Sequence, residues 1–158
     1  MGRNAAKKTD ERSALKARDL YAWAVRQSEL LRSHKLDEID AEALAEEIDD
    51  VGEEQYLRLE SALRVLLQHL LKWDFQPAKR SRSWTLTVRE QRRRVQRQLQ
   101  KNPSLKSRLD EAFVEAYEDA RDGAAGETGL PLSAFPETSP LSFAEAMERA
   151  IVWPGDEG

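Results

Sequence analysis

The chain contains no cysteine, and this absence removes several kinds of site from a sequence of 158 residues. Disulfides, iron–sulfur clusters held by thiolates, zinc sites built on cysteine and thiol nucleophiles are all excluded. Histidine is also scarce, with two residues. The lack of cysteine is consistent with a reducing compartment, so we expect a cytoplasmic protein that folds without a cofactor or a metal.

Long apolar runs and the common catalytic motifs are missing as well. No stretch approaches the roughly 18 apolar residues of a membrane span, and residues 1–10 are polar, unlike a signal peptide. The segment 123–129 lacks the Lys-Ser/Thr of a phosphate-binding loop, and no Gly-x-Ser-x-Gly elbow occurs. We therefore expect no membrane association, and we assign no catalytic residue.

Strand signals are almost absent, whereas Leu, Ile, Val and Ala recur at helical spacing. A first helix is predicted from Asp19, which can cap it, to about Ser33. A very long helix follows from Asp40 to Trp73, with a bend most plausible at Gly52, because glycine costs about 1 kcal/mol in a helix. The expected inner stripe of this long helix consists of Leu44, Ile48, Val51, Gln55, Leu59, Leu63, Leu66, Leu67 and Leu70.

The second half of the chain predicts two more long helices and a short one. Pro77 must end the long helix, and Ser81 or Ser83 opens the next, which stops at Asn102 and Pro103. A fourth helix should begin at Asn102 or Ser104. Residues 126–140 are expected to form an extended connection, and 142–145 have the spacing of a capping box.

These elements predict an all-α protein, namely an up-and-down helical bundle of four main helices with one long helix and a short C-terminal helix. We expect residues 1–18 to form a polar, mobile or loosely packed N-terminal arm. Residues 19–153 should form a single helical-bundle domain, and 154–158 a tail.

Charge is divided unevenly along the chain. Residues 64–108 carry 13 Lys/Arg against two acids, a net charge of +11, while the rest carries 12 basic and 27 acidic side chains, a net charge of −15. The overall net charge of −4 hides this contrast. Two opposed electrostatic fields in one small chain indicate an interaction surface or mutual pairing of helices.

Several short strings in the sequence resemble one bacterial family, known as domain of unknown function 29. They extend over roughly residues 19–141, and residues 141–153 match less clearly. The resemblance implies an all-helical fold and brings no activity or catalytic residue with it. The strings include His69-Leu70-Leu71-Lys72-Trp73, Gln76-Pro77, Ser83-Trp84, Thr87, Glu90-Gln91-Arg92 and Glu127-Thr128-Gly129-Leu130-Pro131.

A polar cluster with two tryptophans is expected at the hairpin between the second and third predicted helices. A histidine beside tryptophans could act as a general base or hold a small ligand. Histidines and tryptophans at such places more often serve packing, however, so we favour a structural role. The cluster consists of His69, Lys72, Trp73, Gln76, Trp84 and Thr87.

An arginine-rich face on the third predicted helix is the main candidate binding surface. Arginine suits phosphate and carboxylate groups, but the isoelectric point of about 5.4 is far from that of a typical nucleic-acid module. Acidic helix faces elsewhere in the chain offer internal partners. The face consists of Arg89, Arg92, Arg93, Arg94 and Arg97.

A run of acids at residues 46–54 is interpreted as a solvated or ion-paired helix face. Neither histidine has a Glu three residues before it, so the pattern of a helical dimetal site is absent.

We therefore predict a non-enzymatic interaction module, with a protein partner or a second copy ranked above nucleic acid. The alternatives are polyanion binding by the arginine face and a ligand or enzymatic site around His69, Trp73 and Trp84.

Overall fold

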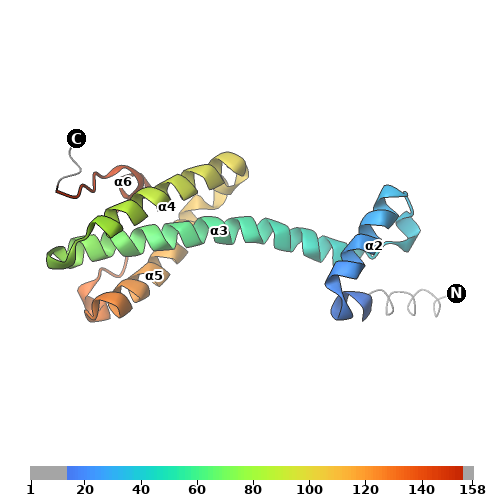
Figure 1. Cartoon of the computed structure of the whole chain (residues 1–158), viewed down its shortest axis with the longest axis horizontal. Coiled ribbons are helices and arrows are strands. Elements are labelled where there is room, and N and C mark those ends of the chain that lie inside the picture. The colour runs from blue at the N-terminus through green and yellow to red at the C-terminus, as the bar shows by residue number, and fades with distance from the viewer. Residues whose placement is uncertain (1–13, 155–158) are drawn as a thin grey trace. The chain divides into compact units, whose positions relative to one another are not determined.

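The computed structural model describes residues 14–154 and confirms the all-α fold (Figure 1). Helices linked by short 3-10 turns make up this part of the chain, and it contains no strand. Contacts divide the chain into two compact units, Met1–Glu53 and Glu54–Gly158. Whether residues 19–153 behave as one domain, as the sequence predicts, stays a prediction.

The first unit is built on α2 (Leu20–Arg32), a 3-10 turn (Leu36–Glu38) and the first part of α3 (Ala41–Phe75). Asp19 caps α2 as predicted, because its side chain accepts a hydrogen bond from the Ala22 amide. Trp23 and Leu30 are buried, and the Gln27 side chain accepts from the backbone amide of Asp40. This bond ties the end of α2 to the start of α3.

The end of the predicted N-terminal arm is ordered within the first unit. Residues 14–18 are helical, and Lys16 lies over the Trp23 ring and forms ion pairs with Glu46 and Glu47. The remaining arm residues, 1–13, and most of the predicted tail, 155–158, lie outside the described residues.

The predicted inner stripe of α3 is correct only from its middle onward. Leu59, Leu63 and Leu66 are fully buried, but Ile48 is 69% exposed and Val51 61% exposed. The earlier residues are helical as predicted, but Ile48 and Val51 are not buried. The bend expected at Gly52 stays a prediction.

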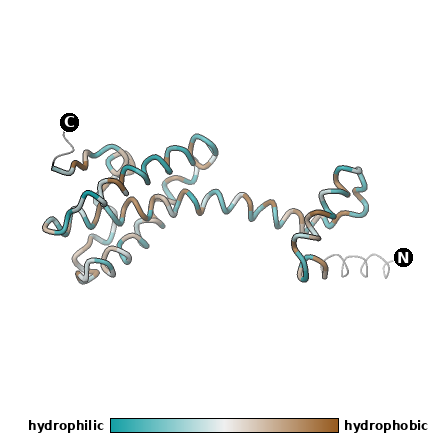
Figure 2. Tube along the Cα trace, viewed as in Figure 1, coloured by the Kyte–Doolittle hydropathy of each residue, from teal (hydrophilic) through white to brown (hydrophobic). Residues whose placement is uncertain are grey.

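The second unit packs α4 (Arg82–Lys101) and α5 (Leu109–Thr128) against the remainder of α3 (Figure 1). A 3-10 turn (Pro77–Lys79) makes the hairpin between α3 and α4, as Pro77 predicts. Gln98 near the end of α4 donates to Gln55 in the middle of α3, while Trp84 at the start of α4 contacts Lys72 near the end of α3. The two helices are therefore antiparallel. Most of α4 is hydrophilic (Figure 2).

The core of this unit joins the leucines of α3 to small and aromatic residues of α5. Ala112, Ala116 and Ala120 are completely buried, which lets α5 approach α3 closely. Val88 and Val95 contribute from α4, and Phe135 closes the cluster from the loop after α5.

Two predicted boundaries around α5 are wrong. Pro103–Arg108 forms a 3-10 turn, so α5 begins at Leu109 and not at Asn102 or Ser104. The helix then continues through Gly126 to Thr128 and ends at Gly129, which has a left-handed φ of 72°. The connection therefore starts later than expected and contains a further turn, Leu132–Ala134.

The last helix is α6 (Phe143–Glu148), and its predicted capping box is present between Ser142 and Glu145. Arg149, which follows it, pairs with Asp74 of α3 through its two terminal guanidinium nitrogens, Nη1 and Nη2. Among residues 14–154, no helix combines the length and the apolar character needed to cross a membrane.

Candidate functional site

Arg92, a member of the predicted arginine face, contacts the end of α6. Its guanidinium donates to the backbone carbonyls of Ala146 and Arg149 at 3.0 and 2.7 Å. These carbonyls lie at the C-terminal end of α6, where no further helical amide is available to them. Burial, followed by the charge of Arg149, lowers the pKa of Arg92. Arg92 therefore fastens α6 to α4.

The other four predicted arginines are exposed on α4. Arg94 pairs with Glu90 of the same helix at 2.6 Å. Arg89, Arg93 and Arg97 form no hydrogen bond or ion pair with any residue between 14 and 154. Acids of the second unit, to which α4 belongs, thus do not neutralise these three arginines. We call Arg89, Arg93 and Arg97 the arginine row.

A groove of about 480 Å³ runs between α3 and α4, and Arg97 of the arginine row lines it. Ala62 and Val65 line its apolar part together with Leu57, which is 52% exposed. Arg97 and Arg94 line it on the α4 side, and the pair of Arg58 and Glu54 on the α3 side. The remaining lining residues are Ser61, Gln91 and Gln98.

The predicted polar cluster centres on an ion pair that the sequence did not suggest. Lys72 is almost completely buried, and its ammonium lies 2.5 Å from a carboxylate oxygen of Glu127 on α5. The same ammonium lies 4.6 Å from the centre of the Trp84 ring. The Lys72 ammonium thus joins α3, α4 and α5. The hydrogen bond from Lys72 to Glu127 is the main cause of the lowered pKa of Glu127.

His69 is half-buried on α3, and its Nδ1 lies 2.9 Å from the Val65 carbonyl. Since a carbonyl can only accept, Nδ1 carries a proton, and Nε2 of the neutral ring is an acceptor. Burial is the largest cause of a lowered His69 pKa, and the charge of Lys72 acts in the same direction. A ligand or catalytic role for His69 stays a hypothesis.

The remaining members of the cluster hold the helix ends together. Trp73 is buried, and Arg80 stacks on its ring at 4.7 Å and donates to its carbonyl. Gln76 donates to the Thr128 carbonyl at the end of α5. Thr87 bonds only within α4, to the Ser83 carbonyl. Except for Thr87, these contacts are those of packing anchors.

Gln68, Gly123 and Glu127 were not predicted to belong to this cluster. Gln68 donates to Glu127 at 2.8 Å, and it packs against Gly123 of α5. Glu127 begins one of the family-like strings, Glu127-Thr128-Gly129-Leu130-Pro131, so that string was the available signal. Periodicity alone could not reveal the pairing, because it joins residues 55 positions apart.

Replacement of Gly123 by alanine should destabilise the protein by about 1 to 3 kcal/mol, as expected for an overpacked site. A Cβ at this position would lie 2.6 Å from the side-chain oxygen of Gln68 and would displace the amide that holds Glu127. Urea denaturation would measure the effect. Gly126→Ala is the matched control, because nothing lies within 4 Å of its Cβ. It should be neutral or stabilising, and equal losses in both variants would contradict this explanation.

The acid run is solvated or ion-paired as predicted. Glu46 and Glu47 pair with Lys16, and Glu54 pairs with Arg58. Within the described part of the chain, no group of three or more His, Asp or Glu side chains has the arrangement of a metal site.

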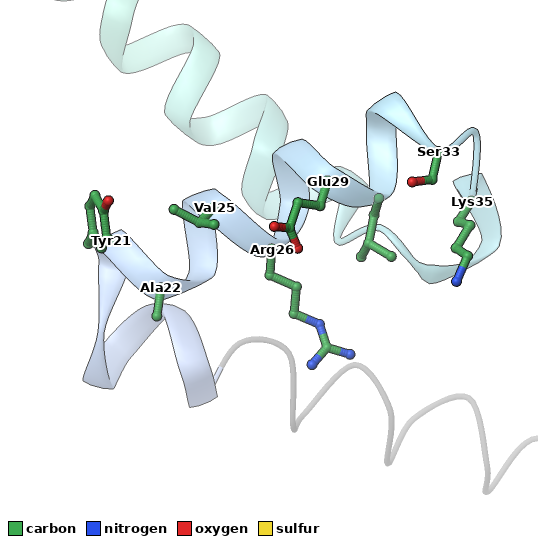
Figure 3. Close-up of a pocket in the computed structure, with 8 residues that line it drawn as sticks. Tyr21, Ala22, Val25, Arg26, Glu29, Ser33 and Lys35 are labelled. Carbon is green, nitrogen blue, oxygen red and sulfur yellow. The ribbon is translucent and has the colours of Figure 1, made fainter.

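A second hollow, of about 690 Å³, lies along α2 in the first unit (Figure 3). Tyr21, which is 80% exposed, Val25 and Glu29 follow one another at intervals of four residues along this face. Arg26 and Lys35 contribute cationic groups. The hollow is open, and it combines apolar groups with charges of both signs, so its shape and charge do not select a ligand.

Comparisons with known proteins give a family and no function. Neither a curated protein nor a solved structure matches the chain. The family described as "Domain of unknown function DUF29" matches residues 15–152, which extends the resemblance through α6. Because this match covers most of the sequence, the chain belongs to the DUF29 family.

Proposed function

We propose that this protein is an interaction module whose α3–α4 groove binds an acidic, amphipathic segment of a protein. The observation that carries the proposal is the arginine row, which has no partner among the described residues and whose Arg97 lines the groove. Unpaired arginines at the edge of an apolar surface supply both orientation and binding area for such a segment.

The groove offers the two kinds of contact that a helical ligand needs. Leu57, Ala62 and Val65 provide an apolar surface, and Arg97 provides a charge that its own chain leaves unneutralised. A helix can place apolar residues at intervals of three or four against such a surface and direct its acids to the rim. The groove volume is in the range that accommodates several side chains.

An acidic protein segment fits this surface better than nucleic acid does. The basic groups are concentrated on α4, whereas the chain as a whole has a net charge of −4. A long nucleic acid would extend beyond α4 and meet the many acids of the chain, which would repel its phosphates. A short acidic helix needs only the groove and its rim.

Replacing Arg93 and Arg97 by glutamate should lower affinity for immobilised poly-glutamate by about tenfold or more. Each lost exposed pair is worth up to about 1 kcal/mol, and repulsion adds to the loss. The measurement is the salt concentration that elutes each variant. The control Lys79→Glu/Lys106→Glu has the same charge change at exposed residues outside the groove. It should elute close to the unmodified protein, and equal losses in both variants would refute the assignment.

Polyanion binding is the second candidate, because Arg89, Arg93 and Arg97 recur at intervals of four on one helix. Such a row could follow a phosphate backbone. Retention on duplex DNA to a higher salt concentration than on poly-glutamate, lost in Arg93→Glu/Arg97→Glu, would favour this candidate over the acidic protein segment.

A further inference from the structure

We infer that two copies of this chain associate through the first turns of α3, which pack antiparallel about a two-fold axis at Ile48. The contact uses a different part of α3 from the α3–α4 groove, so it goes beyond the proposed function. We call residues 41–52 the contact segment. An uncharged exposed face, the position of the acids and a self-complementary order of large and small side chains carry the inference.

One face of the contact segment is exposed and carries no charge. Successive side chains of a helix are rotated by about 100°, so the six residues of this face fall within about 120° of the helix surface. Ile48 is 69% exposed and Val51 61% exposed, while Leu44 is half-buried. A continuous exposed apolar face marks a site of protein contact. The face consists of Ala41, Leu44, Ala45, Ile48, Val51 and Gly52.

The acids of the contact segment lie away from this face. Every one of them, including Asp49 and Asp50, is rotated by about 100° or more from Ile48. Glu47, on one flank of the face, pairs with Lys16 of its own chain. When two such faces meet, the carboxylates therefore remain in solvent. They repel those of the other copy weakly, because salt screens exposed charges beyond about 10 Å at 0.1 M.

The side chains of this face are ordered so that the face fits a second copy of itself. In an antiparallel pair centred on Ile48, residues equally far before and after Ile48 lie at the same height. Leu44 of one copy then lies beside Gly52 of the other, and Val51 lies beside Ala45. The members of each pair come from opposite flanks of the face, so they lie side by side as in an antiparallel coiled coil.

Each large side chain thus meets a small residue, which lets the two helices approach closely. No atom of the chain lies within 4 Å of the Cβ position of Gly52, so the place for Leu44 of the other copy is open. A parallel pair would put large beside large and small beside small. The order therefore favours a second copy in the antiparallel direction, with the same surface used by both copies.

Sedimentation velocity on the full chain tests the inference at about 0.05 M and about 0.5 M salt. The unmodified protein should form dimers that are tighter at high salt, because screening weakens the repulsion between the acids of the two copies. Val51→Ser should raise the dissociation constant by about tenfold or more, since each copy loses an apolar contact. Val114→Ser, at a valine of α5 that is 59% exposed, is the matched control and should dimerise normally.

Filling the space at Gly52 tests the order of large and small side chains. Gly52→Leu should raise the dissociation constant by about tenfold or more, because the new side chain occupies the place of Leu44 of the other copy. Helix content should not fall, since leucine favours a helix more than glycine does. Gly126→Leu is the matched control, because Gly126 is also helical with nothing within 4 Å of its Cβ position. It should dimerise normally.

The chain has no cysteine, so introduced thiols report on the axis without a background. Ile48→Cys should form disulfide-linked dimers under mild oxidation, because residue 48 faces itself across the axis. Asp50→Cys, on the other side of α3, should not. Ala45→Cys should be crosslinked in a mixture with Val51→Cys and not by itself.

Several results would overturn the inference. One is an unmodified protein that stays monomeric at both salt concentrations up to about 1 mM protein. Others are self-association that Val51→Ser leaves unchanged, and equal crosslinking of Asp50→Cys and Ile48→Cys. Crosslinking of Ala45→Cys by itself would show parallel helices and would refute the two-fold axis at Ile48.

Binding to poly-glutamate is a separate measurement, so the two proposals can fail independently. Val51→Ser should retain that binding, and Arg93→Glu/Arg97→Glu should remain dimeric. The salt responses are also opposite, because screening strengthens the dimer and weakens binding of an acidic ligand to arginines. A monomeric protein that binds poly-glutamate through Arg93 and Arg97 would refute this inference alone.

Discussion

Replacing Glu127 by alanine is expected to lower the free energy of unfolding by about 2 kcal/mol. The substitution removes the carboxylate partner of the Lys72 ammonium. Lys72 is only 7% exposed, so water cannot fully replace that partner. A buried charge that loses its partner typically costs 3 to 5 kcal/mol. The side chain of Glu127 itself is 53% exposed, so water offsets part of this cost. Urea denaturation followed by circular dichroism measures the difference.

Lys72→Met is the matched control, because it removes the charge and keeps most of the apolar stem. It should cost less than Glu127→Ala, since no unpaired charge is left behind. If Lys72→Met is the more destabilising change, contact of the ammonium with Trp84 contributes more than the ion pair does.

The pH dependence gives an independent check through Glu127→Gln. The pKa of Glu127 in the folded protein is lowered, so its carboxylate stabilises the fold fully above the unfolded pKa of about 4.3. This contribution is lost as the pH falls through the folded value. The difference between the unmodified protein and Glu127→Gln should therefore be largest near pH 7 and should vanish in acid. A difference independent of pH would show that the amide disturbs packing instead.

Helices were predictable from the sequence because their signals are local. Asp19 as a cap, Pro77 as a stop and the Ser142–Glu145 capping box each act within one turn of backbone, and all three are present. Coverage of a helix face depends on distant elements. The helical spacing of Ile48 and Val51 could therefore predict an apolar stripe but not its exposure.

The contacts of the candidate site residues could not be predicted from the sequence. Arg92 and Arg93 are neighbours of the same type, yet Arg92 binds the end of α6 and Arg93 stays exposed. Their different contacts depend on the path of the chain after α5, which brings the end of α6 to Arg92. Similarly, Lys72 was identified, but its partner Glu127 lies on a helix that the periodicity placed only approximately.

Replacing Trp23 by alanine should remove about 3 to 5 kcal/mol from the first unit and leave the second unit folded. Trp23 is 2% exposed and is the largest buried side chain of the first unit. The hydrophobic cluster of the second unit lies entirely between Tyr56 and Ile151, so it loses no contact of its own. A unit of roughly 50 residues has little stability to spare, and a loss of this size should unfold it.

Hydrogen exchange resolved by segment measures this outcome in the full chain. Trp23→Ala should abolish protection in α2 and leave α4 and α5 protected. Leu66→Ala, at a fully buried position of the second unit, is the reciprocal control and should lower protection in α4 and α5. Equal loss of protection across both units in each variant would instead support the single domain over residues 19–153 that the sequence predicts. Independent loss would mean that the two units are separately stable, so a variant in one can be tested without unfolding the other.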